Sequence, residues 1–357
     1  MKKVFKDLER LVSVDTANMD GNKKELISCI LKDFFGFAKT SQVLYTGDSI
    51  SAMLFGINCD LMTASNGLVF SGHIDTVPSN AKYAFDDFCF CGRGTSDMKS
   101  FFPCLKEIFK NIDVKEIRIP IIVAVSFDEE TSNKGISAIK EYLLDNNIKH
   151  RYCIVGEPTS STYSLSSYGC YDFDITIKGE ESHVSNKGKH NAIDDLLKCM
   201  NALKRMASSY DATTVKITYV RAGETLNVSP SACRLGFQIR TLNIENVTAI
   251  CDQLSSLMSA DGVVMSLVKC NNDLPPFLNP DSYVGKILGN NNGASHIDFP
   301  ATTEAGGFQE LGIDTVICGP GDIKLAHRAD EHIYYSDMKE YNLLIEKCIQ
   351  ILNLEYT

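Results

Sequence analysis

Four short apolar runs, each followed at once by a polar segment, constrain the fold of this chain more than any other feature. They are "GLVFSG" before His73, "IRIPIIVAVSF" before Asp128, "YCIVG" before Glu157 and "DTVICG" before "PGD". Helical apolar patterns lie between the first three runs, at residues 101–109 and 136–144. This alternation predicts an α/β fold with a mostly parallel sheet and helices on both faces, and sites in such sheets lie at the carboxyl ends of the strands.

The segment from 170 to 280 follows another pattern. Its elements are expected in the order strand, helix, strand, strand, helix, strand, beginning with an alternating strand at 171–177. This is the split βαβ arrangement of an α+β domain. Because "DTVICGPG" resumes the buried-strand pattern, we predict a discontinuous domain of residues 1–169 and 281–357, interrupted by an inserted domain of residues 170–280. A last helix with Ser336 as its N-cap candidate closes the chain.

Charge and length exclude several classes of protein. A chain of 357 residues is long enough for two cores, and its formal net charge of −10 without a basic run opposes binding to nucleic acid or an anionic membrane. The start "MKKVFKDLERLVSV" interleaves charges with apolar residues, which indicates an amphipathic helix rather than a signal peptide, and no apolar stretch is long enough to span a membrane. Thirteen cysteines without a C-x-x-C pair are typical of reduced thiols, so we predict a cytoplasmic protein.

Common catalytic motifs are missing. "GRGTSD" lacks the third glycine and the acidic residue of a dinucleotide site. The sequence contains neither the phosphate-loop pattern G-x-x-x-x-G-K-[ST] nor the nucleophile elbow G-x-S-x-G. Covalent serine catalysis is therefore not expected.

What remains is a set of metal-type side chains at the ends of the predicted strands. They are His73, Asp75, Asp97, Glu129, Glu130, Glu157 and His327. Each alone has an ordinary alternative as a helix cap, a turn former or a solvated helix start. A parallel sheet brings strand ends side by side, and two histidines with three carboxylates suit two zinc ions. Two Zn²⁺ ions carry a charge of +4 and three carboxylates a charge of −3, so one bound hydroxide would make such a site neutral.

Two spacings suggest how these side chains divide their roles. Residues i and i+2 of an extended segment share a face, and a metal-binding imidazole normally donates its second N–H to a carboxylate. Asp75 is therefore predicted to contact His73 and no metal, with a turn cap before Pro78 as the alternative. Adjacent side chains diverge, so one of Glu129 and Glu130 can bind metal while the other takes a proton from water.

The motifs resemble the acetylornithine deacetylase and succinyl-diaminopimelate desuccinylase family of two-zinc amidohydrolases. "SGHIDTVP", "GRGTSDMK", "DEE", "GEPT", "NVSP" with "QIRTLN", and "AHRADE" occur in the family's order. The resemblance implies a zinc-exopeptidase-like fold, an inserted ferredoxin-like lid and dimerisation domain, and a homodimer formed through residues 170–280. It further implies His73 and Glu157 on one zinc, Glu130 and His327 on the other, Asp97 between them, Glu129 as general base and Asp75 as orienting carboxylate.

The resemblance also assigns residues outside the strand ends. His183 corresponds to the histidine that reaches the partner subunit's active site and polarises the scissile carbonyl, with His190 as a nearby competitor. Asn227 and Arg240 match residues that hold the substrate's carboxylate. The run "ATTEAGGFQELGIDTVICGPGDIKLAH" is similar to the acetylornithine deacetylase branch. Glu304 would then face the amine of ornithine, and an ordinary surface glutamate is the alternative.

Three departures from the family pattern concern the substrate pocket and no proposed ligand. The chain has no Trp in the loop after Pro78, Tyr168 precedes Gly169 where the branch has Lys or Arg, and "SHVSN" lacks a following proline. The predicted reaction is deacetylation of N-acetylornithine in arginine biosynthesis, with zinc that cobalt can replace. The alternatives are N-acetylcitrulline deacetylase, succinyl-diaminopimelate desuccinylase, dipeptidase or aminoacylase, and a ligand-binding protein without catalysis.

Overall fold

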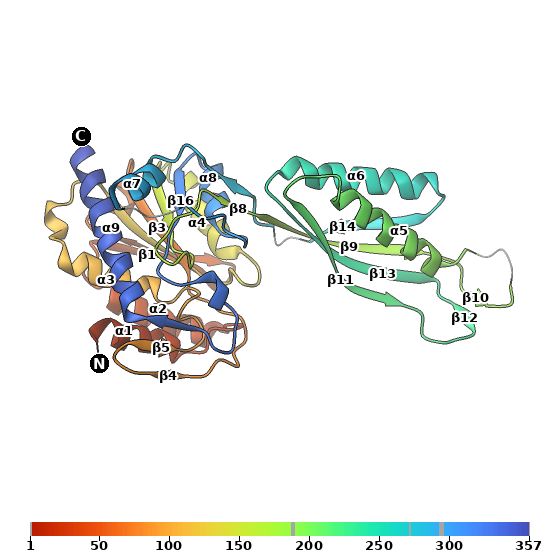
Figure 1. Cartoon of the computed structure of the whole chain (residues 1–357), viewed down its shortest axis with the longest axis horizontal. Helices are drawn as coiled ribbons and strands as arrows, with labels where there is room; N and C mark the ends of the chain where they lie inside the picture. Colours follow the sequence, from red (N-terminus) through yellow and green to blue (C-terminus); the bar gives the residue numbers. More distant parts are fainter. Residues whose placement is uncertain (1, 187–189, 271–272, 293–295, 357) are drawn as a thin grey trace. The chain divides into compact units, whose positions relative to one another are not determined.

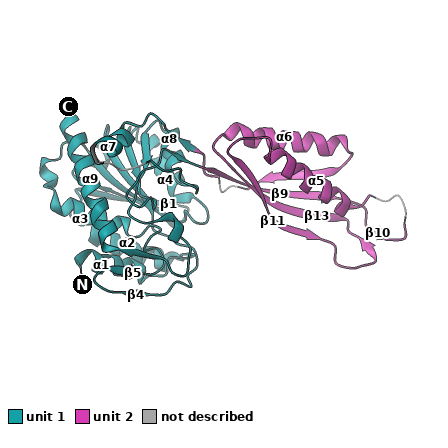
Figure 2. Ribbon diagram, in the orientation of Figure 1, with its two compact units in different colours: residues 1–167, 277–357 teal, residues 168–276 magenta. Residues whose placement is uncertain are grey.

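The computed structural model describes residues 2–186, 190–270, 273–292 and 296–356. They form two compact units, which Figure 2 colours separately. Unit 1 comprises Met1–Ser167 and Phe277–Thr357, and unit 2 is the continuous segment Tyr168–Pro276. The sequence-based prediction puts the borders after residues 169 and 280, and the catalytic and lid roles that it gives to the two domains remain predictions.

Unit 1 is built on a six-stranded sheet with the strand order β1-β2-β6-β3-β7-β16. Figure 1 labels β1, β3 and β16 of this sheet. The strands of the sheet are β1 (Thr40–Thr46), β2 (Ser49–Gly56), β3 (Leu68–His73), β6 (Ile121–Ser126), β7 (Tyr152–Val155) and β16 (Asp314–Ile317). The last four run parallel, and every residue of β3, β6 and β7 is buried, as in sheets covered on both faces. The mostly parallel α/β sheet is thus confirmed, and the antiparallel hairpin β1–β2 at its edge is an addition to the prediction.

Helices pack on this sheet. They are α1 (Lys3–Val12), α2 (Gly21–Phe34), α3 (Phe101–Asn111), α4 (Lys134–Asp145), α7 (Tyr283–Asn292), α8 (Ala305–Glu310) and α9 (Tyr335–Glu355). Of these, α1, α2, α3, α7 and α9 share one apolar core with the sheet. α3 packs against α1 and α9, whereas α4 packs on β1, β2 and β6 and contacts α8. The N-cap expected at Ser336 is wrong, because α9 begins at Tyr335 and its N-cap is Tyr334, whose backbone N–H donates a 3.4 Å hydrogen bond to Asp337.

Unit 2 carries a four-stranded antiparallel sheet with the order β11-β13-β9-β14. Its main elements are β9 (Gly169–Lys178), α5 (Ala192–Ala207), β11 (Thr213–Ala222), β13 (Ala232–Thr241), α6 (Ile244–Ala260) and β14 (Val264–Lys269). In β9 the odd-numbered residues 171–177 are buried and pack with residues of both helices in a separate core. The element order and strand order are those of the predicted split βαβ arrangement.

Short elements complete both units. In unit 1 they are the sheet of β4 (Ala84–Phe85), β5 (Cys89–Cys91) and β17 (His332–Tyr334), the pair β8 (Ser166–Ser167) and β15 (Phe277–Leu278), and the 3₁₀ turns Leu61–Thr63, Val114–Glu116 and Ile323–Leu325. In unit 2, β10 (Ser182–His183) pairs with β12 (Val228–Ser229). Among the described residues, no helix has both the length and the apolar character that crossing a membrane requires.

Candidate metal centre

Three neighbouring parallel strands end at the same edge of the large sheet. His73 is the last residue of β3 and lies opposite Ser126, the last residue of β6. Glu129 and Glu130 follow β6, and Glu157 follows β7, which pairs with β3 on its other side. The parallel register therefore brings the side chains that follow these strands to one place.

The structure assembles two groups of possible metal ligands that share Asp97. His73, Asp97 and Glu157 form the buried cluster, and Asp97, Glu130 and His327 form the open cluster. Within each cluster one ligand atom of every member lies within 4.8 Å of the others. Nε2 of His73 is 3.3 Å from Asp97 Oδ1, and Nε2 of His327 is 3.2 Å from Asp97 Oδ2. One carboxylate thus presents one oxygen to each histidine.

The two clusters differ in exposure and in backbone support. The His73 side chain is 2% exposed and stands at the end of a central strand, whereas the His327 side chain is 50% exposed. His327 lies in a loop and has a φ of +63°, in the left-handed region that costs a non-glycine residue about 1–3 kcal/mol. The surrounding loop must hold His327 in this conformation.

Asp75 supports His73 differently from the prediction. Nδ1 of His73 donates to the backbone carbonyl of Asp75 at 2.9 Å, and the nearest carboxylate oxygen of Asp75 is 3.7 Å away. A carbonyl only accepts, so Nδ1 carries a proton, and Nε2 is the ring nitrogen that faces Asp97. The Asp75 carboxylate instead accepts the backbone N–H groups of Glu129 at 3.1 Å and Glu130 at 3.0 Å. It therefore ties the loop after β6 to the end of β3.

The electrostatics of the centre fit divalent cations. Burial opposes protonation of His73, but Asp97, Glu129 and Glu157 outweigh it and raise the pKa of the imidazole well above its usual value. Hydrogen bonds to Asp97 and Glu130 raise the pKa of His327 to about 10. Asp97 Oδ1 is buried and has no hydrogen-bond partner among the described residues. Excess negative charge, an unsatisfied carboxylate oxygen and imidazole nitrogens form a donor set for metals of borderline softness.

Glu129 lies beside the clusters without belonging to either of them among the described residues. Burial raises the pKa of its carboxyl well above the usual value, and the neighbouring charges of Glu157, Glu130 and Asp75 act in the same direction. The adjacent pair is thus divided: Glu130 belongs to the open cluster, with an oxygen 3.0 Å from His327 Nε2, and Glu129 belongs to neither cluster.

Two buried charged residues that the sequence analysis missed support these loops. Lys24 of α2 is 3% exposed, and its ammonium group pairs with Asp128, the residue before Glu129. Asp128 itself has a φ of +69°. Glu331 is fully buried and accepts hydrogen bonds from the loop that carries Asp97. Glu331 ends the motif "AHRADE", so this motif was the available signal, whereas a lysine in an amphipathic helix gives none.

The remaining predicted site residues lie elsewhere. His183 and Asn227 are exposed on the β10–β12 ribbon of unit 2, and His183 Nδ1 is 2.7 Å from Ser185 Oγ. Arg240 lies near the carboxyl end of β13, and Ala232 is the first residue of that strand. At a rise of about 3.3 Å per residue, the two residues are roughly 26 Å apart. The structure therefore does not bring Asn227 and Arg240 together within one chain. His190 pairs with Asp195 at 3.0 Å.

Glu304 is a buried side chain, and its contact with a substrate amine remains a prediction. It is 1% exposed and lies behind β3, where Ser71 Oγ donates to its Oε2 at 3.3 Å. Burial raises the pKa of its carboxyl. The alternative of an ordinary surface glutamate is wrong, because the side chain is buried.

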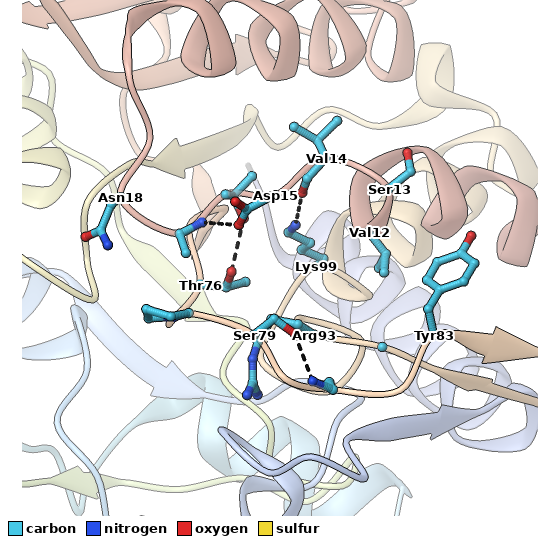
Figure 3. A pocket seen from close by; sticks show the side chains of 15 residues that line it. Val12, Ser13, Val14, Asp15, Asn18, Thr76, Ser79, Tyr83, Arg93 and Lys99 are labelled. Carbon is cyan, nitrogen blue, oxygen red and sulfur yellow. Dashed lines mark hydrogen bonds between the residues drawn. The ribbon is translucent and has the colours of Figure 1, made fainter.

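A cavity of about 560 Å³ lies in unit 1 next to the Asp97 loop (Figure 3). Its lining includes Asp15, Thr76, Arg93 and Lys99. Lys99 is buried, and its Nζ donates to the carbonyls of Leu11 and Val14 at 3.0 Å each, while burial lowers its pKa to about 7. The loop that carries Asp97 therefore borders this cavity as well as contributing to both clusters.

Comparison with known proteins identifies the family. The model of peptidase family M20/M25/M40 matches residues 69–350, a range that contains every residue of both clusters. The chain belongs to this family. As a member of the M20/M25/M40 family it is a metal-dependent hydrolase, and its clusters are candidate sites for the divalent ions.

Curated relatives support one branch of the M20/M25/M40 family. The acetylornithine deacetylase of Buchnera aphidicola subsp. Schizaphis graminum is 25% identical and covers 97% of both chains. That of Photorhabdus laumondii subsp. laumondii is 26% identical over 79% of both chains. The resemblance to the acetylornithine deacetylase branch is thereby confirmed.

Solved structures show the same fold over nearly the whole chain. A tripeptidase from Staphylococcus aureus has a TM-score of 0.83 with 18% identity, and covers 99% of this chain and 98% of its own. The aminopeptidase PepT from Bacillus cereus has a TM-score of 0.80 with 17% identity and 98% coverage of both chains. At these identities the likeness concerns the fold and not the substrate.

Proposed function

We propose that the protein hydrolyses the amide bond of an N-acyl amino acid, with N-acetylornithine as substrate and ornithine and acetate as products. The observation that carries the proposal is the pair of ligand clusters sharing Asp97, with Glu129 beside them. The choice of substrate rests on the curated relatives named acetylornithine deacetylase. This reaction would place the enzyme in arginine biosynthesis and in the cytoplasm.

The proposed ligand sets follow the two clusters. His73 and Glu157 would hold one zinc ion, Glu130 and His327 the other, and Asp97 both, with cobalt able to replace zinc. When bound, the ions supply Lewis-acid polarisation and acidify a water molecule. The Nδ1 proton of His73, held by the carbonyl of Asp75, keeps Nε2 free to act as a ligand.

The proposed proton carrier is Glu129. Its carboxylate takes a proton from the attacking water and delivers it to the departing amine, the two general acid–base steps that amide hydrolysis requires. Asp75 fixes the backbone of Glu129 by accepting its N–H at 3.1 Å. The position of the proton carrier therefore depends on the end of β3 as well as on its own loop.

The substrate contacts and the assembly are also proposals. The protein would form a homodimer through residues 170–280, and the partner subunit's His183 would polarise the scissile carbonyl. Asn227 and Arg240, which lie far apart within one chain, would hold the substrate carboxylate from two subunits. Glu304, which is buried with His73 and Asp75 among its charged neighbours, would face the amine of ornithine.

A substrate panel with the zinc- or cobalt-loaded protein tests this function. N-acetylornithine is expected to have a higher kcat/KM than N-acetylcitrulline, N-succinyl-diaminopimelate, a dipeptide and a tripeptide. A preference for either peptide would replace deacetylation by peptidase activity on the same scaffold. If the protein binds its metal ions but hydrolyses none of these substrates, the result would favour a ligand-binding function over an enzymatic one.

A further inference from the structure

Glu331 lies at the centre of a compact hydrogen-bond arrangement in unit 1. Its side chain is fully buried. Oε1 accepts the backbone N–H groups of Gly94 at 2.9 Å, Ser96 at 3.1 Å and Asp97 at 3.1 Å, and Oε2 accepts from the guanidinium group of Arg93. Three of the four donors are thus backbone groups of one short loop, and the last of them is that of Asp97.

The same loop is fixed on further sides. The backbone N–H of Gly92 donates to the carbonyl of Glu331 at 3.0 Å, and Ser96 Oγ donates to the Asp322 carbonyl at 2.9 Å. A Cβ at Gly321 would stand 2.1 Å from the Ser96 carbonyl oxygen, so only glycine allows this close approach. The segment 92–97 is therefore held chiefly by residues 321–331, which also include His327.

The charge balance explains why a carboxylate can be buried there. Arg93 is 8% exposed and neutralises Glu331, and hydrogen bonds to an ionised acceptor are about twice as strong as neutral ones. A neutral amide in place of the carboxylate would keep the volume but offer one oxygen to four donors. Either Arg93 or the backbone N–H groups of the loop would then face an NH2 group instead of an acceptor, and the remaining oxygen would be a neutral, weaker acceptor.

We infer that Glu331 is a positioning residue of the metal centre, which holds the Asp97 loop so that one carboxylate can serve both clusters. Asp97 is the only member common to the two clusters that the described residues form. A shift of its loop would consequently weaken both sites at once. The inference rests on the part of the proposed function that makes Asp97 a metal ligand, and is independent of the substrate.

The test compares Glu331→Gln with the neighbouring variant Asp330→Asn. Asp330 is exposed, and its carboxylate pairs with Arg328 through contacts of 2.7 and 3.0 Å, so it controls for loss of a negative charge at this place in the chain. Zinc affinity is measured by chelator competition on metal-free protein, and the melting temperature of the same metal-free samples is recorded. Glu331→Gln is expected to bind zinc about 10–100-fold more weakly, the usual effect of losing a group that orients a ligand, and Asp330→Asn to match the wild type.

A lower melting temperature with unchanged zinc affinity would show that Glu331 only stabilises the fold, and would overturn the inference. If Glu331→Gln does not fold, Arg93→Lys takes its place, since it keeps the charge and loses the guanidinium geometry; unchanged zinc affinity there would overturn the inference equally. Wild-type protein that binds zinc but cleaves no panel substrate would sink the proposed reaction and leave this inference intact. Wild-type protein that binds no zinc would remove both.

Discussion

The buried and open clusters share a carboxylate but are built in different ways. His73 and Glu157 come from the ends of paired parallel strands in the centre of the sheet and are at most 4% exposed. Glu130 and His327 come from loops, and the His327 side chain is half exposed. Groups on regular elements are held more precisely than groups on loops. We therefore expect the buried cluster to bind its ion more tightly and the open cluster to exchange its ion more readily.

The largest effect on activity is expected from Glu129, which belongs to neither cluster among the described residues and therefore separates proton transfer from metal binding. Glu129→Gln is expected to lower kcat by at least about 10²–10⁴-fold, the usual contribution of a general acid–base group. Its zinc content should stay near that of the wild type, because no ligand is lost. Turnover assays and metal analysis of one sample measure both. Substantial activity in this variant would remove Glu129 as the proton carrier.

The two histidines allow a direct comparison of the clusters. His73→Ala removes a buried imidazole that pairs with Asp97, a change that typically costs about 3–5 kcal/mol, and should abolish binding of the tighter ion. His327→Ala should lose only the weaker ion and change the free energy of unfolding of the metal-free protein little. Metal analysis and urea unfolding measure these effects. Equal losses in the two variants would contradict the difference between the clusters.

The support under the loop of Glu129 and Glu130 can be broken separately. Lys24→Met leaves Asp128 partly buried without its partner, and we expect a loss of about 3 kcal/mol in the free energy of unfolding. Lys23→Met is the matched control, since Lys23 pairs with Asp15 at the surface and such pairs contribute about 0–1 kcal/mol. Urea unfolding of both variants at neutral pH is the measurement. Similar values for the two lysines would mean that the buried pair does not hold this loop.

The smallest expected effect concerns a histidine outside both clusters. Neither ring nitrogen of His150 has a hydrogen-bond partner in the part of the chain that the structure describes, and burial lowers its pKa to about 4. The unfolded chain, with a pKa of about 6.5, binds the proton more readily, so stability falls as pH drops from about 6.5 to 4 and is fully present above that window.

His150→Phe should remove about 2 kcal/mol of this acid sensitivity between pH 7 and 5. The same substitution at the exposed His296 should leave it unchanged. Unfolding curves at the two pH values provide the comparison. An unaltered pH dependence in His150→Phe would show that His150 is not the group responsible.

Local patterns predicted much of the fold because they depend on neighbours in sequence. The buried runs of β3, β6, β7 and β16 and the split βαβ order of unit 2 are visible as apolar periodicity. The hairpin of β1 and β2 was missed because β1 is mostly polar and at the sheet edge. The exact start of α9 was missed because Asp337, and not Ser336, bonds the chain entering the helix.

The candidate site divides in the same way. Side chains directly after strands, such as His73 and Glu157, could be placed from sequence because their strands could be. Lys24 and Glu331 could not, since their partners are 104 and up to 238 residues away. Asp75 shows that spacing can predict which residue contacts His73 but not which of its groups does so. The hydrogen bond is made by the backbone carbonyl and not by the carboxylate.

The pair β8–β15 has a consequence for how this architecture can change. Ser167 and Phe277 are partners in an antiparallel ladder, so the chain leaves unit 1 and returns to it at adjacent points, about 5 Å apart between Cα atoms. The whole of Tyr168–Pro276 could therefore be excised and the ends rejoined by a two-residue hairpin turn. Because unit 2 is encoded by one continuous segment, a single insertion or deletion in the gene could add or remove it without disturbing the strands that carry the ligands.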